Sequence, residues 1–213
     1  MRTSRFSLVA LLLLALTTLA GCTQSKEKGI AMANDFVKAW NAGGDTLSQQ
    51  IAKINAALDS LTFKSSFVDA FIDEAGKNDS TLSLAAKVLL KDSTEVADAL
   101  SDEIIDGLAS GTLNYTQANA KVMQLAQVCS KLNKDGLNKA FGSMLDSKAA
   151  ALSLEKQMKV YSSATTPEKL GKALKVDARA GADKALLDSQ IKALKSIYSD
   201  DDYKIFIDAY NND

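Results

Sequence analysis

The sequence predicts an all-α protein, built as an antiparallel helical bundle or a small helical array of about eight to ten short helices. Three observations lead to this prediction. The 213-residue chain has one proline and few aromatic residues. Apolar residues recur at every third or fourth position along most of it, which is the period of a helix with one buried face. Runs in which apolar and polar residues alternate, as they do in half-buried strands, are absent from the sequence.

Residues 1–21 are predicted to be a cleaved targeting signal that takes no part in the fold. Arg2 and Arg5 give the segment a positive start, and the unbroken apolar run Leu8–Leu16 follows. This run is shorter than the roughly 20 residues that a membrane-spanning helix needs. Small residues and a cysteine then follow at Leu19-Ala20-Gly21-Cys22, where a signal would be cut.

The four residues Leu19–Cys22 resemble the lipobox of bacterial lipoproteins. The resemblance covers only the leader and its cleavage site. It implies a cut between Gly21 and Cys22, and acylation of both the sulfur and the new amino group of Cys22. Anchoring by three acyl chains would be nearly irreversible, because each buried methylene contributes about 0.8 kcal/mol. An ordinary secretory signal with a chance cysteine is the alternative.

The resemblance also implies a location, the bacterial cell envelope, with the membrane held through the lipid on Cys22. In the same family, Thr23 in place of aspartate after the cysteine implies the outer rather than the inner membrane. Residues 22–29 are expected to be the lipidated cysteine and a short polar tether. A flexible tether of that length reaches about 10–15 Å, so the domain would sit close to the bilayer.

Residues 30–213 are predicted to form a single helical domain. Cleavage removes two of the 25 basic residues and none of the 26 acidic ones, which leaves 23 against 26 and a net charge of −3. That charge argues against a nucleic-acid partner. Cys129 is the only cysteine left once Cys22 carries lipid, so no intrachain disulfide is expected.

The first half of the domain is predicted to contain five helices. Glycines or a glycine-containing turn follow the first and third helices and the fifth, and a capping-box spacing at Asp92–Glu95 opens the fifth. An Asp79 or Ser80 cap opens the fourth. The expected ranges are 30–40, 45–61, 63–75, 79–89 and 92–108.

The second half is predicted to contain five more helices. Thr166-Pro167-Glu168 is a strong helix start, because it combines a hydroxyl cap, a proline in the first position and an acid in the first turn. Ser199–Asp202 caps the last helix in the same way. The expected ranges are 114–133, 137–161, 167–176, 186–198 and 200–210.

The two ends of the domain resemble each other. Leu47-x-x-Gln50-Ile51-x-x-Ile54 recurs as Leu187-x-x-Gln190-Ile191-x-x-Leu194, 140 residues later. Phe67-Val-Asp-Ala-Phe71 recurs as Phe206-Ile-Asp-Ala-Tyr210, 139 residues later. An old duplication and the general similarity of amphipathic helices both explain the match, and the sequence leaves the two open.

The sequence contains no histidine. Histidine is the usual general base near neutral pH and the commonest metal ligand, so nucleophile systems and zinc sites that depend on it are excluded. The sequence therefore predicts no catalytic residue, no metal ligand and no cofactor. Cys129 lies on an apolar row and is expected to be a buried, unreactive thiol.

The clearest charged feature is a row of acidic residues on the fifth helix. Its members are spaced three or four residues apart, on the side away from the apolar face, and are Glu95, Asp98, Asp102 and Asp106. Residues 121–175 contain ten lysines against four acids. The row is a candidate interaction face, although a solvated surface is the simpler explanation. The sequence leaves open whether the acidic and basic regions face each other.

The favoured function is a lipid-anchored cell-envelope protein whose domain acts as a binding, interaction or structural module, with an envelope protein as a candidate partner. The first alternative is a carboxylate- or metal-dependent envelope enzyme that uses the acidic row. The second is an inhibitor or immunity-type protein that acts through one charged face.

Overall fold

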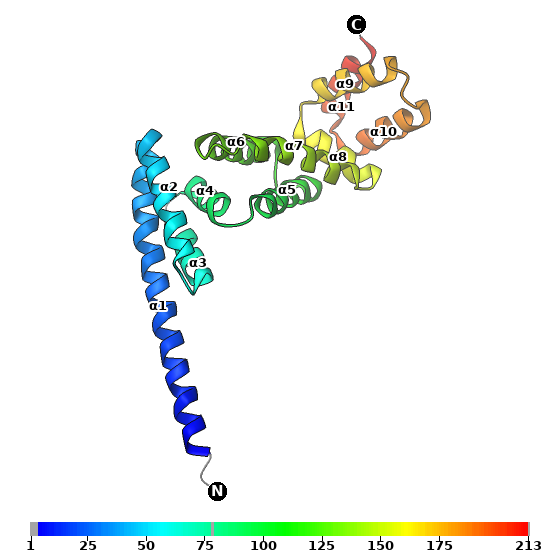
Figure 1. Ribbon diagram of the computed structural model, residues 1–213. Coiled ribbons are helices and arrows are strands. Elements are labelled where there is room, and N and C mark those ends of the chain that lie inside the picture. The colour runs from blue at the N-terminus through cyan, green and yellow to red at the C-terminus, as the bar shows by residue number, and fades with distance from the viewer. Residues whose placement is uncertain (1–3, 78, 213) are drawn as a thin grey trace. The chain divides into compact units, whose positions relative to one another are not determined.

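The protein is all-α. The computed structural model describes residues 4–77 and 79–212, and within these ranges it contains 11 helices and no strand, with about 85% of the chain helical (Figure 1). This confirms the predicted fold class. Residues 4–20 are described as helical backbone only, so the side chains of the predicted leader, including the apolar run, lie outside the described residues.

The helices group into two compact units. Unit 1 comprises residues 1–93 with residues 130–133, and unit 2 comprises residues 94–129 with residues 134–213. The sequence predicts one domain over residues 30–213, and the contacts within the chain divide this range at Ser93.

Unit 1 is organised around one long helix. Its helices are α1 (Ser4–Ala42), α2 (Gly44–Asp59), α3 (Lys64–Ala75) and α4 (Ser80–Leu90). The most extensive helix contact is between α1 and α3, and α2 also packs on α1 (Figure 1). Gly29 permits the close approach of α1 to α3, because a Cβ atom there would lie 2.5 Å from the backbone oxygen of Phe67.

The core of unit 1 is aromatic. The ring of Phe36 lies 5.5 Å from that of Phe71 and 5.9 Å from that of Trp40, and all three side chains are buried. Lys131 Nζ lies 4.5 Å from the centre of the Trp40 ring and donates a hydrogen bond to the Trp40 backbone oxygen at 3.3 Å. Trp40 is therefore a core residue, and the favourable geometry of a cation over its ring adds to the packing.

The predicted tether differs from the structure. Residues 23–28 are part of α1, and Ser25 is only 3% exposed. The polar residues and Gly29 led to the prediction of a linker, because serine and glycine are weak helix formers. In the structure Ser25 and Gly29 lie on the buried side of α1, and Gly29 lets the helix approach α3.

Unit 2 contains the remaining helices, from α5 onward, except that Ser93 of α5 and the last two residues of α6 belong to unit 1. They are α5 (Ser93–Ser110), α6 (Tyr115–Lys131), α7 (Asp135–Ala150), α8 (Leu154–Ala164), α9 (Pro167–Arg179), α10 (Lys184–Ile197) and α11 (Asp200–Asn211). The helix predicted over residues 137–161 is thus two helices. The Gln157 side chain donates hydrogen bonds to the backbone oxygens of Ala150, at 2.9 Å, and Leu152, at 2.7 Å, and so closes the turn between them.

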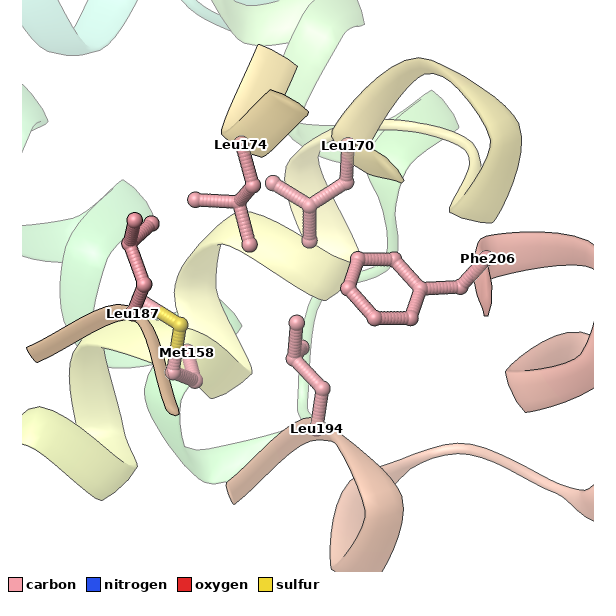
Figure 2. Close-up of a cluster of buried hydrophobic side chains, with 6 residues drawn as sticks. All are labelled: Met158, Leu170, Leu174, Leu187, Leu194 and Phe206. Carbon is pink, nitrogen blue, oxygen red and sulfur yellow. The ribbon is translucent and has the colours of Figure 1, made fainter. Parts of the chain in front are cut away.

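The core of the C-terminal part of unit 2 is formed by α8, α9, α10 and α11. Figure 2 shows its buried side chains pointing toward one another from these four helices: Met158, Leu170, Leu174, Leu187, Leu194 and Phe206. The tyrosines of α11 pack around Phe206, so this aromatic row belongs to the core rather than to a ligand groove.

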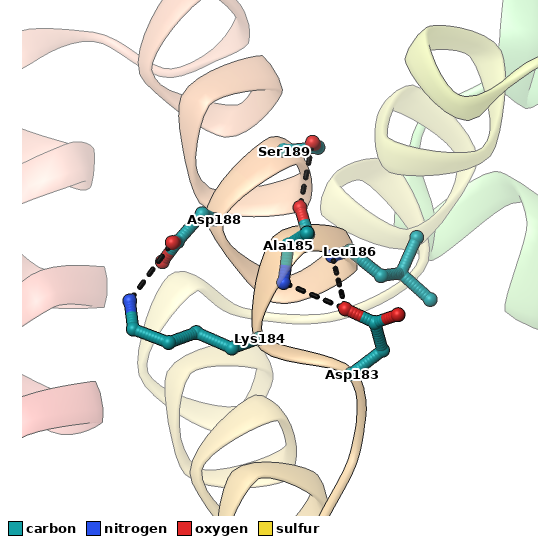
Figure 3. Close-up of polar contacts among 6 residues, drawn as sticks. All are labelled: Asp183, Lys184, Ala185, Leu186, Asp188 and Ser189. Atoms are coloured by element: carbon teal, nitrogen blue, oxygen red, sulfur yellow. Dashed lines mark hydrogen bonds and ion pairs between the residues drawn. The ribbon is translucent and has the colours of Figure 1, made fainter.

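Local hydrogen bonds define most helix starts in unit 2. Thr166 Oγ1 accepts a hydrogen bond from the backbone of Lys169 at 3.3 Å, as its sequence predicts. Asp183 caps α10 by accepting from the backbone of Ala185, at 2.7 Å, and Leu186, at 3.3 Å (Figure 3). Each cap satisfies backbone donors that have no partner within the helix.

Candidate functional site

The predicted lipidation residue, Cys22, lies within α1 and is partly buried. Its neighbour Gly21 lies against the turn between α2 and α3, since a Cβ atom at Gly21 would come within 2.5 Å of the Phe63 ring. Ser25, one helical turn further on, is already buried. The residue expected to carry lipid is therefore joined directly to a packed part of unit 1. Its acylation stays a prediction.

All four members of the predicted acidic row lie on α5 and are exposed: Glu95, Asp98, Asp102 and Asp106. The helix turns its apolar side, which includes Ile104 and Leu108, inward. The prediction that these carboxylates lie on the solvent side of the helix is therefore confirmed.

Lysines from other helices of unit 2 pair with acidic side chains of α5, two of which belong to the acidic row. Lys148 of α7 forms an ion pair with Asp98 at 2.9 Å and a second one with Asp102. The hydrogen bonds that Lys148 donates to these carboxylates, that to Asp102 first, raise the pKa of Lys148. Lys121 of α6 pairs with Glu103 at 2.8 Å. The acidic helix and the lysine-rich segment thus face each other, which answers the question that the sequence leaves open.

The acidic row does not form a metal site in the described part of the chain. Residues 21–77 and 79–212 contain no group of three or more side chains placed to hold a metal ion. Asp106 instead lines a shallow surface depression together with Glu103 and Lys156. Asp98 and Asp102 instead converge on the ammonium group of Lys148, and two carboxylates already paired with a lysine supply fewer oxygen ligands than a hard cation requires.

An apolar groove in unit 2 is the feature best suited to bind a ligand. It has a volume of about 280 Å³, is open to solvent on one side and is lined by α5, α6, α7 and α8. Its walls are mainly aliphatic, and most of the aliphatic side chains that form them are buried. The apolar lining residues are Ile104, Ile105, Leu108, Ala118, Val122, Leu145, Ala149, Val160 and Ala164.

Two tyrosines and two short polar side chains complete the groove. Tyr115 is 46% exposed and Tyr161 37% exposed, although both also line it. Asn119 and Asp146 are exposed lining residues. Apolar walls with a few polar groups are the usual composition of a small-molecule site. The tyrosines can contribute an apolar ring face and a hydroxyl each.

The tyrosines of the groove were not identified from the sequence. Tyr115 is the first residue of α6, seven positions before Val122, and Tyr161 lies near the end of α8, three positions after Met158, so helical spacing places each on an apolar row. An aromatic residue at such a position predicts a core residue rather than part of a ligand site. The sequence around each tyrosine does not indicate which other helix end lies beside it. The groove can therefore be identified only from the structure.

The remaining candidates have structural roles. Cys129 is 0% exposed, which confirms the predicted burial, and burial followed by the charge of Asp135 raises the pKa of its thiol, which disfavours the reactive thiolate. The Ser199 hydroxyl accepts from the backbone of Asp202 at 3.2 Å, which makes the acids after it the first turn of α11. Acids in that position are stabilised by the helix dipole.

No protein-family model matches this sequence, and comparisons with curated proteins and with solved structures found no match. Any function must therefore be argued from the chain's own residues. Over the part of the chain whose side chains are described, the search for a helix long and apolar enough to cross a membrane found none.

Proposed function

We propose that this protein is a lipid-anchored protein of the bacterial cell envelope, attached through Cys22, that binds a small apolar molecule in the groove of unit 2. The observation that carries the anchor is the sequence Leu19-Ala20-Gly21-Cys22 after a positive start and an apolar run. Its likeness to a lipobox supports lipidation, and Thr23 favours the outer membrane. The protein acts as a binding module rather than as an enzyme.

The ligand class follows from the groove. Its aliphatic walls favour a hydrocarbon or aromatic body, because removing apolar surface from water contributes about 25 cal/mol per Å². Its volume of about 280 Å³ suits a molecule at the small end of the range for ligand sites. The hydroxyls of Tyr115 and Tyr161, with Asn119 and Asp146, supply polar contacts for one end of such a molecule.

Replacement of Cys22 tests the anchor. Cys22→Ala is expected to move the protein from the membrane fraction to the soluble fraction and to abolish labelling with radioactive palmitate. The chain offers a matched control, because Cys129→Ala removes the other cysteine, which is buried. That variant should stay in the membrane and keep its label. Label that persists in Cys22→Ala would refute the anchor.

Filling the groove tests the binding site. Ala164 lines it from the end of α8, so Ala164→Leu is expected to weaken binding of an apolar naphthylamine dye about tenfold, the equivalent of about 1.4 kcal/mol. Ala151→Leu is the matched control, since Ala151 is exposed and does not line the groove. Equal dye affinity of the two variants in a fluorescence titration would show that the groove is not the site.

The two other functions suggested by the sequence depend on the acidic row of α5. A metal-dependent enzyme needs carboxylates that converge, and an inhibitor needs an anionic face that is free for a partner. Lys148 already engages Asp98 and Asp102. No specific observation therefore favours either function over a binding module.

A further inference from the structure

We propose that the turn between α2 and α3, residues 60–63, forms a second contact with the membrane together with Lys64, the first residue of α3. In this contact the Phe63 ring enters the lipid interface and Lys64 meets the phosphate headgroups. The occupant of this surface is the phospholipid bilayer itself. The proposal rests on the proposed lipid anchor at Cys22 and adds a contact made by the folded protein.

The first step is the position of the turn. Gly21 lies so close to Phe63 that a Cβ atom on Gly21 would fall 2.5 Å from one carbon of the ring and 2.9 Å from the next. Cys22 follows directly on the same helix. The acyl chains on Cys22 would therefore leave the protein beside this turn.

The second step is that no flexible linker separates Cys22 from the packed part of α1. Ser25 and Gly29 are buried along α1, and Gly29 lies against the Phe67 backbone of α3. Cys22 precedes Ser25 by three residues, a rise of about 4.5 Å on a helix. A bilayer that takes up the acyl chains must then approach the packed end of unit 1 to within about one helical turn.

The third step is the apolar chemistry of the turn. Leu61 and Phe63 are both partly exposed. Signal cleavage before Cys22 would remove Gly21 and leave the side of the Phe63 ring that it contacts without cover. Aromatic side chains are favoured at the boundary between headgroups and hydrocarbon. The mature protein would therefore present an apolar ring at the point where its lipid enters the membrane.

The fourth step is charge. Lys26 and Lys28 are exposed on α1 just after Cys22, and Lys64 is exposed at the start of α3. The exposed acids closest to them in the sequence are Glu27 on α1 and Asp59 at the end of α2, so the lysines exceed these acids by one. Lysines near an anionic membrane surface are attracted to it, and their long stems let the ammonium groups reach the headgroups. The charge of this end therefore fits a phosphate surface, although the mature chain as a whole is acidic.

The experiment places a spin label on the turn of the full, lipidated protein in vesicles of phosphatidylethanolamine and phosphatidylglycerol. Phe63→Cys supplies the site, because Cys22 would be acylated and Cys129 is buried. Thr62→Cys, at an exposed neighbour, repeats the measurement with the ring intact. Asp73→Cys is the control, as it is exposed on α3 and lies about 15 Å further along that helix.

The label at residues 62 and 63 is expected to be roughly tenfold less accessible to a water-soluble nickel complex than the label at residue 73, because polar solutes are excluded from hydrocarbon. Equal accessibility on vesicles that still carry the protein would overturn the membrane contact and leave the anchor standing. Protein that neither stays on the vesicles nor takes up palmitate would overturn both proposals.

Discussion

At the scale of single residues, Tyr198 is the most unusual side chain. Its hydroxyl is buried and has no hydrogen-bond partner among the described residues. Its ring lies 6.0 Å from that of Phe206, in the core of the four C-terminal helices. Burial, and then the nearby charge of Asp202, raises the pKa of Tyr198 to about 12. The ring thus contributes packing, while burial of the unpaired hydroxyl costs desolvation free energy.

Tyr198→Phe is therefore expected to leave stability unchanged or to raise it by about 1 kcal/mol, because it removes an unpaired buried group and keeps the ring. Urea unfolding at neutral pH measures the difference. Tyr115→Phe, at an exposed tyrosine, controls for the loss of a hydroxyl as such. A Tyr198→Phe variant that is less stable by about 1 kcal/mol or more would show that the hydroxyl has a partner.

The same substitution changes the response to alkaline pH. The pKa of Tyr198 is about 12 in the folded protein against 10.0 for the ordinary side chain, so the unfolded chain loses this proton first. Between about pH 10 and pH 12 the contribution of Tyr198 to stability therefore falls as the pH rises. The wild type should lose more stability than Tyr198→Phe across this window, and parallel curves would contradict the assignment.

At the scale of helices, the starts were the most predictable features. Asp79, Thr166 and Ser199 cap α4, α9 and α11 as the sequence indicates. A cap is a hydrogen bond between residues two or three positions apart, so all the information lies in a few adjacent residues. The apolar rows of these helices were predictable for the same reason, because the spacing of a helix's own residues defines its buried face.

Two helix boundaries could not be predicted, for different reasons. Residues 23–28 look like a linker, and they are helical because Ser25 and Gly29 are buried where α1 packs against a distant helix. The break between α7 and α8 depends on the Gln157 side chain, which bonds back to the turn. A glutamine in an amphipathic stretch gives no sign of that role. Both differences arise from contacts that a local pattern does not encode.

The candidate sites also differ in whether local sequence spacing predicts them. The solvent-facing acidic row of α5 was predictable from spacing alone. Its pairing with Lys148 of α7 was not, since 46 residues separate Lys148 from Asp102. The groove was likewise not predictable, because its lining comes from four helices. Sequence periodicity states which side of a helix is buried but not what lies opposite.

At the scale of the whole chain, the two ends contain the same close helix contact. In unit 1, Gly29 of α1 lies against the Phe67 oxygen and the Ala70 methyl of α3. In unit 2, Gly171 of α9 lies against the Phe206 oxygen and the Ala209 methyl of α11. The contacted residues are those of the repeated sequence, 139 positions apart, so the resemblance extends beyond amphipathic spacing.

The correspondence is strongest in these helix pairs and weaker around them. Ile54 of α2 and Leu194 of α10 are equivalent in the repeat, and both are 0% exposed. However, α2 packs on α1, whereas α10 packs mainly on α8. A duplication of a three-helix unit explains the shared pair and the shared buried positions. The duplication also requires that α10, the middle helix of the second copy, changed its packing partner, because it packs mainly on α8.

The shared contact makes a prediction about both ends of the chain. Gly29→Ala and Gly171→Ala should each destabilise the protein by about 1–3 kcal/mol, because the added methyl group would overlap backbone atoms of the facing helix. Gly142→Ala is the matched control, since Gly142 lies within α7 and a methyl group added there would have no neighbour within 4 Å among the described residues.

The control should be more stable than the wild type by up to about 1 kcal/mol, because alanine is the better helix former. Urea unfolding of the three variants separates the two effects, as helix propensity acts in the same direction at all three positions and only the contact differs. If Gly29→Ala or Gly171→Ala gained stability as Gly142→Ala does, the helices at that end would not depend on close approach. Loss of stability at both ends would mean that one glycine-dependent helix pair is used twice in the chain.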